Sequence, residues 1–191
     1  MKSKKILTSL LALSMATSMM AVPVFATGIT VGADGEGAEV PVELTTEAAT
    51  FSVTVPTSLP ISVAADGTIT TATDAKIVNN GCGAVLVTNV AIEGIDTWEV
   101  VDFDSADMTK EKVGATKVAM KINNDVTTGD DAITFTQSNW TSIAGKNDTD
   151  TDELAITYEA KVPAQAAALN DVSVCNVTFT VGWDTLVESG I

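Results

Sequence analysis

Histidine and arginine are both absent from this 191-residue sequence, so its 10 basic residues are all lysine. Without histidine, neither a Ser-His nor a Cys-His catalytic pair can form, and the commonest general base at neutral pH is missing. The sequence also contains no G-x-S-x-G, HExxH or P-loop motif. Paired carboxylates could still support glycoside hydrolysis, but the acidic residues fall mostly in predicted turns or on polar strand faces. We therefore predict that the protein is not an enzyme.

Positive charge is scarce after the first 26 residues. Three of the lysines and none of the 25 acidic residues lie in residues 1–26, so residues 27–191 carry 10 − 3 = 7 lysines and a net charge of 7 − 25 = −18. Phosphate binding requires clustered lysine or arginine. The charge balance therefore excludes nucleic acid as a partner, and it disfavours anionic membrane surfaces for the same reason.

Only one long hydrophobic run is present, and it lies at the N-terminus. Residues 6–21 carry no charge. Lys2, Lys4 and Lys5 lie just before this stretch, and Val24-Phe25-Ala26 follows it. This pattern is typical of a secretory signal peptide over residues 1–26; a retained membrane anchor is the alternative. Cleavage would leave residues 27–191, a chain of 191 − 26 = 165 residues that suits one domain. We expect a secreted or cell-surface protein with no membrane segment after cleavage.

The sequence has two cysteines, Cys82 and Cys175, and no CxxC or other metal-ligand spacing. An exported protein meets an oxidising compartment, which favours a disulfide between them. Closing a loop of about 90 residues would stabilise the fold by roughly 4–5 kcal/mol in the chain-entropy model. Two free thiols are the alternative.

Residues 171–183 carry the clearest structural pattern in the chain. Apolar residues alternate with smaller or polar ones, and the apolar side is formed by Cys175, Val177, Phe179, Val181 and Trp183. A period of two predicts a β-strand with one buried face. The strand holds one of the two cysteines and one of the three tryptophans, and we expect it to lie in the middle of a sheet.

Similar alternation recurs along the chain between turn signals. We predict nine to eleven strands, mainly within residues 40–44, 51–55, 59–63, 75–79, 84–92, 98–103, 118–122, 133–135, 154–162 and 171–183. Residues 84–92 are apolar on both sides, as in a strand covered on both faces, and residues 163–170 suggest one short helical turn. The predicted fold is an all-β, antiparallel β-sandwich, immunoglobulin-like or jelly-roll-like, in a single domain.

Two loops contain candidate binding residues. Asp148, Asp150 and Asp152 alternate like the first half of a calcium-binding loop, although Glu153 stands where an EF-hand requires glycine. Calcium is thus a possible ligand, and a solvated polar turn is the alternative. Trp140 begins the same polar region and is the candidate for ligand contact, for example with a sugar; tryptophans more often serve in packing, and we place Trp183 on a buried face.

Residues 27–46 form a strand-like, glycine-interrupted arm ahead of the stronger strand at residues 51–55. Val40, Val42 and Leu44 alternate there with Glu39, Pro41 and Glu43. Such an arm can fold back on its own sheet. Alternatively, it can pair with the sheet edge of a neighbour by strand addition, the mode that joins pilin-type subunits.

Three segments resemble small secreted proteins of Gram-positive bacteria: FSVTVPTSLPI at residues 51–61, TATDAKIVNNGCGAVLVTNVAI at residues 71–92, and VTFTVGWD at residues 177–184. They are similar to cell-surface β-sandwich proteins of the WxL kind and, more distantly, to matrix-fibre proteins of the TasA/camelysin kind. The resemblance implies a structural role at the surface or in the extracellular matrix, and it implies no catalytic residue.

Taken together, these patterns predict an exported cell-surface or extracellular-matrix structural protein, potentially a fibre or pilus-like subunit that assembles by strand addition. Its partners would be further copies of itself, or other surface proteins and glycans. The alternative function is a monomeric β-sandwich module that binds a glycan or the cell wall.

Overall fold

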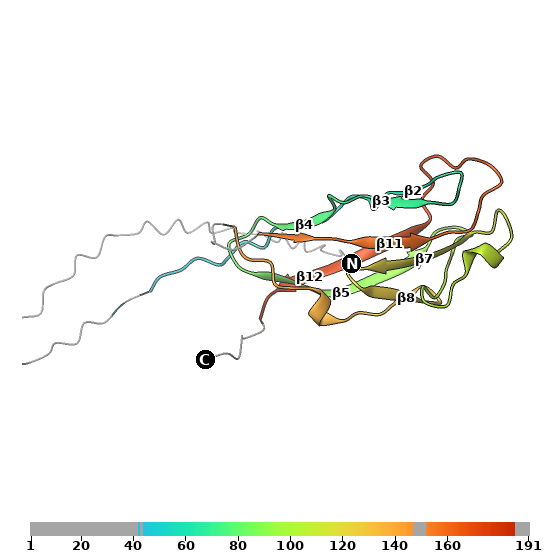
Figure 1. Ribbon diagram of the computed structural model, residues 1–191. Coiled ribbons are helices and arrows are strands. Elements are labelled where there is room, and N and C mark those ends of the chain that lie inside the picture. The colour runs from blue at the N-terminus through green and yellow to red at the C-terminus, as the bar shows by residue number, and fades with distance from the viewer. Residues whose placement is uncertain (1–41, 43, 147–151, 186–191) are drawn as a thin grey trace, which may run out of the picture. The chain divides into compact units, whose positions relative to one another are not determined.

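A computed structural model describes residues 42, 44–146 and 152–185. The chain divides into two compact units, Met1–Thr46 and Glu47–Ile191. The described residues of the first unit, 42 and 44–46, are exposed and belong to no helix or strand. All described strands belong to the second unit (Figure 1).

The described part of the second unit contains twelve strands, two short 3-10 helices and no α-helix. The strands are β1 (Val53–Thr54), β2 (Ile61–Val63), β3 (Ile69–Thr71), β4 (Lys76–Asn79), β5 (Val85–Gly94), β6 (Glu99–Val100), β7 (Lys117–Ile122), β8 (Asp125–Gly129), β9 (Ala132–Ile133), β10 (Glu153–Ala155), β11 (Tyr158–Lys161) and β12 (Cys175–Trp183); the 3-10 helices are η1 (Met108–Lys110) and η2 (Gln137–Asn139). The all-β prediction is confirmed. The helical turn expected at residues 163–170 is wrong, because this segment is an irregular loop.

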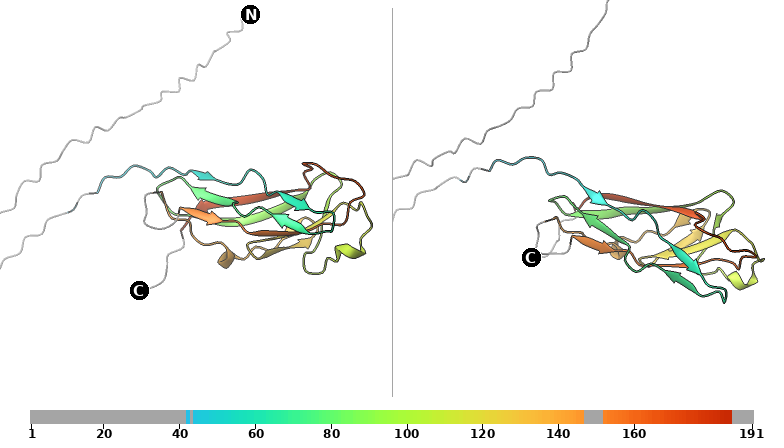
Figure 2. Two further views of the ribbon diagram at one scale, coloured as in Figure 1. Left: turned by 45° about the horizontal axis from the view of Figure 1, so that its top comes forward. Right: turned by 90° about the horizontal axis from the view of Figure 1, so that it is seen from above.

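The strands form small sheets that curl into a half-barrel (Figures 1 and 2). Their orders are β1-β4-β10, β11-β7-β8-β9 with β6 beside β7, β12-β5, and β2-β3. All of these pairs are antiparallel except β6 with β7, where Glu99 lies opposite Lys117 in a parallel pair. The expectation of a purely antiparallel architecture is therefore wrong at β6.

The core fills the inside of this curl. Its most deeply buried apolar side chains come from β4, β5, β7 and the segment after η2, and they include Ile77, Val85, Val87, Val118, Met120, Ile122, Trp140 and Ile143. Burying a side chain such as valine or isoleucine contributes about 1.5–3 kcal/mol. The first three residues of β5 are buried on both faces, as the sequence pattern predicts, whereas its later part alternates between buried and exposed residues.

The strand at the C-terminal end, β12, keeps its predicted alternation from Cys175 to Val181. It does not lie in the middle of a sheet, because β5 is its only partner among the described strands. The expectation for Trp183 is also wrong: its side chain is 37% exposed at the end of the ladder, where it lies over Gly83.

Candidate functional site

One edge of β12 is open. The ladder with β5 runs from Cys175 opposite Gly94 to Trp183 opposite Val85. Hydrogen-bonded pairs alternate along an antiparallel ladder, and the bond from the Ile95 N–H to the Val174 carbonyl (3.1 Å) fixes this alternation. Cys175, Val177 and Phe179 therefore turn their backbone N–H and C=O groups away from β5. No other strand of the described chain pairs with this edge.

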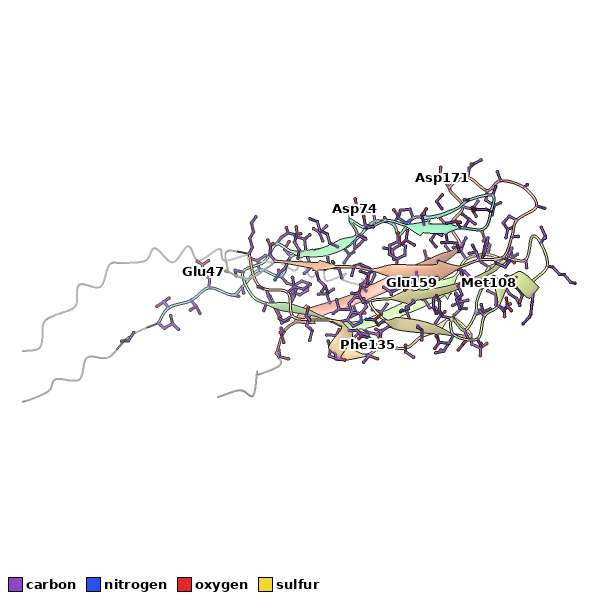
Figure 3. All side chains as sticks on the ribbon, viewed as in Figure 1. Glu47, Asp74, Met108, Phe135, Glu159 and Asp171 are labelled. Atoms are coloured by element: carbon purple, nitrogen blue, oxygen red, sulfur yellow. The ribbon has the colours of Figure 1, made fainter. Side chains whose placement is uncertain are left out.

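A groove of about 930 Å³ lies beside this open edge. One wall is β12, and the other is formed by residues 56–61 and Val63, which include most of β2, and by the loop of residues 162–169. Trp98 and Met120 also line it. Figure 3 shows Asp171 in the loop that rises beside β2 and β3, at the same end of the second unit. The groove thus lies between two segments of sheet that do not pair with each other.

The groove is nearly uncharged, although the protein is strongly acidic. Three of its lining residues are exposed large hydrophobics, namely Val63 (46% exposed), Leu169 (50%) and Val172 (48%). Asp171 is the single charged residue among the described residues that line it. Exposed apolar surface of this kind marks interaction sites in soluble proteins. The groove can therefore bind an extended segment that offers both backbone hydrogen bonds and apolar side chains.

The two cysteines do not form the predicted disulfide, because both thiols are free. Cys175 begins β12, opposite Gly94, whereas Cys82 lies three residues before Val85, which pairs with the other end of β12. Nine strand residues span about 30 Å, and a disulfide needs Cα atoms within about 7 Å of each other. The prediction was wrong because sequence alone did not show that the two cysteines lie at opposite ends of one ladder.

Cys175 instead lines the groove. Its Sγ lies 3.5 Å from the Met120 Sδ, and burial raises the pKa of the Cys175 thiol to about 11. A thiol with a raised pKa is a weak nucleophile because little thiolate is present. At this position Cys175 therefore acts as a small apolar side chain.

Trp140 does not contact a ligand at the surface, since its side chain is only 1% exposed. The short helix η2 folds the polar loop back, so that the Trp140 Nε1–H donates to the buried Asp125 carboxylate at 2.6 Å. Its ring lies 6.4 Å from that of Phe135 and 5.9 Å from that of Phe179. The polar sequence around Trp140 was misleading because Asp125 satisfies the indole inside the core.

Among the described residues, the exposed aromatic side chains are those of Trp183 and Phe51. Their rings meet edge to face at 5.1 Å, and Phe51 is 45% exposed. Gly83 permits this arrangement, because a Cβ at that position would lie 2.8 Å from the Trp183 Cζ3. The alternation of β12 alone does not reveal this, since it places Trp183 on the buried face.

The calcium candidate is only partly described. Asp148 and Asp150 lie outside the described residues, and Asp152 lies just before β10, with its carbonyl accepting from the Asn79 N–H at 2.8 Å. Within the described residues, no three acidic or cysteine side chains gather closely enough to hold a metal ion. The calcium site stays a prediction.

No protein-family model, curated protein or solved structure matches this chain. In the described residues, none of the helices has the length and hydrophobicity that crossing a membrane requires.

Proposed function

We propose that this protein is an exported structural protein of a bacterial surface or extracellular matrix, whose copies associate by strand addition. The observation that carries the proposal is the open edge of β12 beside a groove whose described lining has one charged residue, Asp171. In strand addition, main-chain hydrogen bonds supply affinity and pockets for alternate side chains supply specificity. The backbone groups of Cys175, Val177 and Phe179 face the open edge of β12, and these three residues line the groove.

We propose further that the fold is a single-domain antiparallel β-sandwich of the immunoglobulin-like or jelly-roll-like kind, with one parallel pair of strands, β6 and β7. Side-chain contacts across the half-barrel support this assignment. The inner face of β12 meets β7 through the contact of Cys175 with Met120, and Phe179 packs on Trp140. The half-barrel is then a sandwich that lacks a strand between β12 and β2.

The export and location parts of the proposal rest on sequence. The predicted signal peptide at residues 1–26 directs the chain out of the cell. The resemblance to WxL and TasA/camelysin proteins supports a place at the cell surface or in a matrix.

The test is light scattering and negative-stain imaging of residues 27–191 over a range of protein and salt concentrations. We expect association that rises with concentration, and also with salt, because copies of net charge −18 (7 − 25) repel one another. Val63→Asp and Leu169→Asp place a charge at the rim of the groove and should prevent association. Val113→Asp is the matched control, because Val113 is 64% exposed but does not line the groove.

Two results would contradict the proposal. One is a monomer for the unaltered chain at every protein and salt concentration. The other is equal association of all the aspartate variants, which would place the contact away from the groove.

The second candidate function is a monomeric module that binds glycan or cell wall, and the exposed pair of Phe51 and Trp183 favours it. Aromatic rings with one free face offer a surface for stacking a sugar. Titration with soluble cell-wall or dietary oligosaccharides should then change the tryptophan fluorescence, and Trp183→Ala should abolish the change. An unchanged spectrum at saturating oligosaccharide would remove this candidate.

A further inference from the structure

We infer, resting on the proposed function, that the hairpin of β2 and β3 is a flap that controls access to the groove, and that the Tyr158 hydroxyl holds this flap closed. The hairpin comprises residues 61–71 and forms part of the groove wall that faces β12. The site that would receive a partner strand thus has a gate of its own.

The hairpin is a separate piece of sheet. β2 pairs with β3, and neither pairs with another described strand. Its turn is bonded internally, because the Ala64 N–H donates to the Thr68 carbonyl at 2.8 Å and the Asp66 carboxylate accepts from the Thr68 N–H at 2.9 Å. Of its six strand residues, all of them described, only Ile61 packs against the core cluster. A segment with so little packing can open locally while the rest of the unit stays folded.

The neighbouring ladder stops just before the hairpin. β4 pairs with β10, and backbone bonding continues as far as the Ile156 N–H, which donates to the Ala75 carbonyl at 2.8 Å. Beyond this point the chain bends at Thr73. β3 and β11 then lie beside each other without pairing (Figure 1). The side chain of Tyr158, the first residue of β11, crosses the space between them.

The Tyr158 hydroxyl binds both ends of the hairpin. It donates to the Pro60 carbonyl at 2.6 Å, just before β2, and it accepts from the Ala72 N–H at 3.1 Å, just after β3. Tyr158 is itself fixed, because it is 5% exposed and its strand pairs with β7. Without the hydroxyl, the Pro60 carbonyl and the Ala72 N–H lose their partner, and an unpaired buried group is costly. Both groups regain partners when the hairpin swings out into water.

Movement of the hairpin changes the groove directly. The hairpin contributes five lining residues, Ile61, Val63, Ala64, Ala65 and Gly67, and β12 lines the groove with Cys175, Val177 and Phe179 among others. Outward movement would therefore widen the groove and uncover the open edge of β12. A pairing strand must bring its own backbone to that edge, so its access depends on the position of the flap.

Alkylation of Cys175 tests the inference, because this thiol lies in the groove on the wall that faces the flap. The measurement uses residues 27–191 with Cys82→Ser, so that Cys175 is the single thiol. Tyr158→Phe keeps the ring and removes only the hydroxyl.

Thr134→Val is the matched control. The Thr134 hydroxyl also makes two hydrogen bonds to backbone groups, accepting from the Val126 N–H at 3.0 Å and donating to the Val126 carbonyl at 3.2 Å. Neither residue lines the groove. The control therefore loses the same kind of contact without touching the flap.

At low protein concentration, where copies do not associate, we expect iodoacetamide to alkylate Cys175 about tenfold faster in Tyr158→Phe, because losing two hydrogen bonds favours the open flap by about this factor. The rate in Thr134→Val should equal that of the unaltered residues. Equal rates in all three proteins would overturn the inference. An equal rise in both variants would reflect general destabilisation and would overturn it too.

Amide exchange distinguishes a moving flap from an unfolding hairpin. A flap that swings as a unit frees the Ala72 N–H but keeps the bond of the Ala64 N–H within its turn. Tyr158→Phe should therefore speed exchange at Ala72 and leave Ala64 unchanged. Faster exchange at both residues would show that the hairpin unfolds instead of swinging, and the flap would be ruled out.

Light scattering separates this inference from the proposed function. Under associating conditions, Tyr158→Phe should associate faster than the unaltered chain, and Thr134→Val at the same rate. If both the unaltered chain and Tyr158→Phe stay monomeric while alkylation of Cys175 rises, the flap is supported and the proposed function fails. If the unaltered chain associates but alkylation does not rise in Tyr158→Phe, the proposed function stands and the flap is overturned.

Discussion

The two outer edges of the β5–β12 sheet differ in the hydrogen-bond partners of their outward backbone groups. On β5, the Gly94 N–H donates to the Asp131 carboxylate at 2.9 Å, and the Val87 carbonyl accepts from the Gln137 side chain at 3.1 Å. Val85 exchanges two backbone bonds with Ile143, at 3.0 and 2.8 Å. On β12, the corresponding groups of Cys175, Val177 and Phe179 meet no strand of the described chain.

This difference indicates which edge is available to a partner. Proteins commonly block sheet edges, because an unpaired row of N–H and C=O groups is a template for another chain. The chain blocks the edge of β5 with side chains and a short bridge. It leaves the edge of β12 beside the groove, so under the proposed function we expect strand addition at β12 rather than at β5.

The largest effect is expected from removing the anchor of the blocked edge. Trp140→Ala empties a fully buried site and should lower the free energy of unfolding by about 3–5 kcal/mol. It also removes the indole N–H bond to Asp125, which holds residue 140 beside η2, and the Gln137 amide of η2 covers the Val87 carbonyl. Urea unfolding followed by far-UV circular dichroism measures the loss.

Trp183→Ala is the matched control for this prediction. Trp183 is partly exposed beside the open part of the sheet, so its removal should cost about 1 kcal/mol, as for most partly exposed positions. Equal losses for the two tryptophans would show that η2 does not anchor the β5 edge.

The second effect concerns the thiol at the open edge. The raised pKa of Cys175, about 11 against 9.0 for the reference thiol, means that its thiolate at pH 8 is about 100-fold scarcer than that of the reference. Alkylation of Cys175 by iodoacetamide, measured in Cys82→Ser by mass spectrometry, should be slow by about this factor. Because thiolate increases with pH until the pKa is reached, the rate should keep rising from pH 8 to pH 11. A rate that levels off near pH 9 would contradict the burial of this thiol.

The third effect comes from unblocking the edge of β5. Asp131→Ala removes the acceptor of the Gly94 N–H and should cost about 0.5–1.5 kcal/mol, the usual range for one hydrogen bond. Asp131→Asn keeps an acceptor oxygen and should cost less. Amide exchange at Gly94 should become faster in the alanine variant, approaching that of Val177 in the monomer. An unchanged exchange rate at Gly94 would mean that Asp131 does not block this edge.

The sequence predicted most of the strands because their signal is local, although β3 and β8 fall outside the predicted ranges. Alternation along residues 175–181 depends only on which face is buried, and the structure confirms it. Pairing is not local: nothing in residues 171–183 shows that β12 has one neighbour rather than two. For this reason the sequence alone could not predict the open edge, the groove or the distance between Cys82 and Cys175.

The tryptophans illustrate the same limit. Trp140 stands among polar residues, yet Asp125, 15 positions earlier, accepts its indole N–H inside the core. Trp183 continues an apolar alternation, yet it lies at the exposed end of the ladder against Phe51. The environment of each ring is set by a residue distant in sequence, which periodicity does not reveal.

The smallest effect concerns a third edge, formed by β10. Asp152 precedes this strand and its carbonyl pairs with the Asn79 N–H, so an ion held by Asp148, Asp150 and Asp152 would tie the loop to β4. Because calcium would bind only the folded chain, a concentration equal to its dissociation constant should stabilise the fold by about 0.4 kcal/mol. Thermal unfolding with millimolar calcium measures this, with magnesium as the control ion and Asp150→Asn as the control variant. A shift that is equal for both ions, or that persists in the variant, would reflect screening of the acidic surface and would leave β10 without an ion-dependent block.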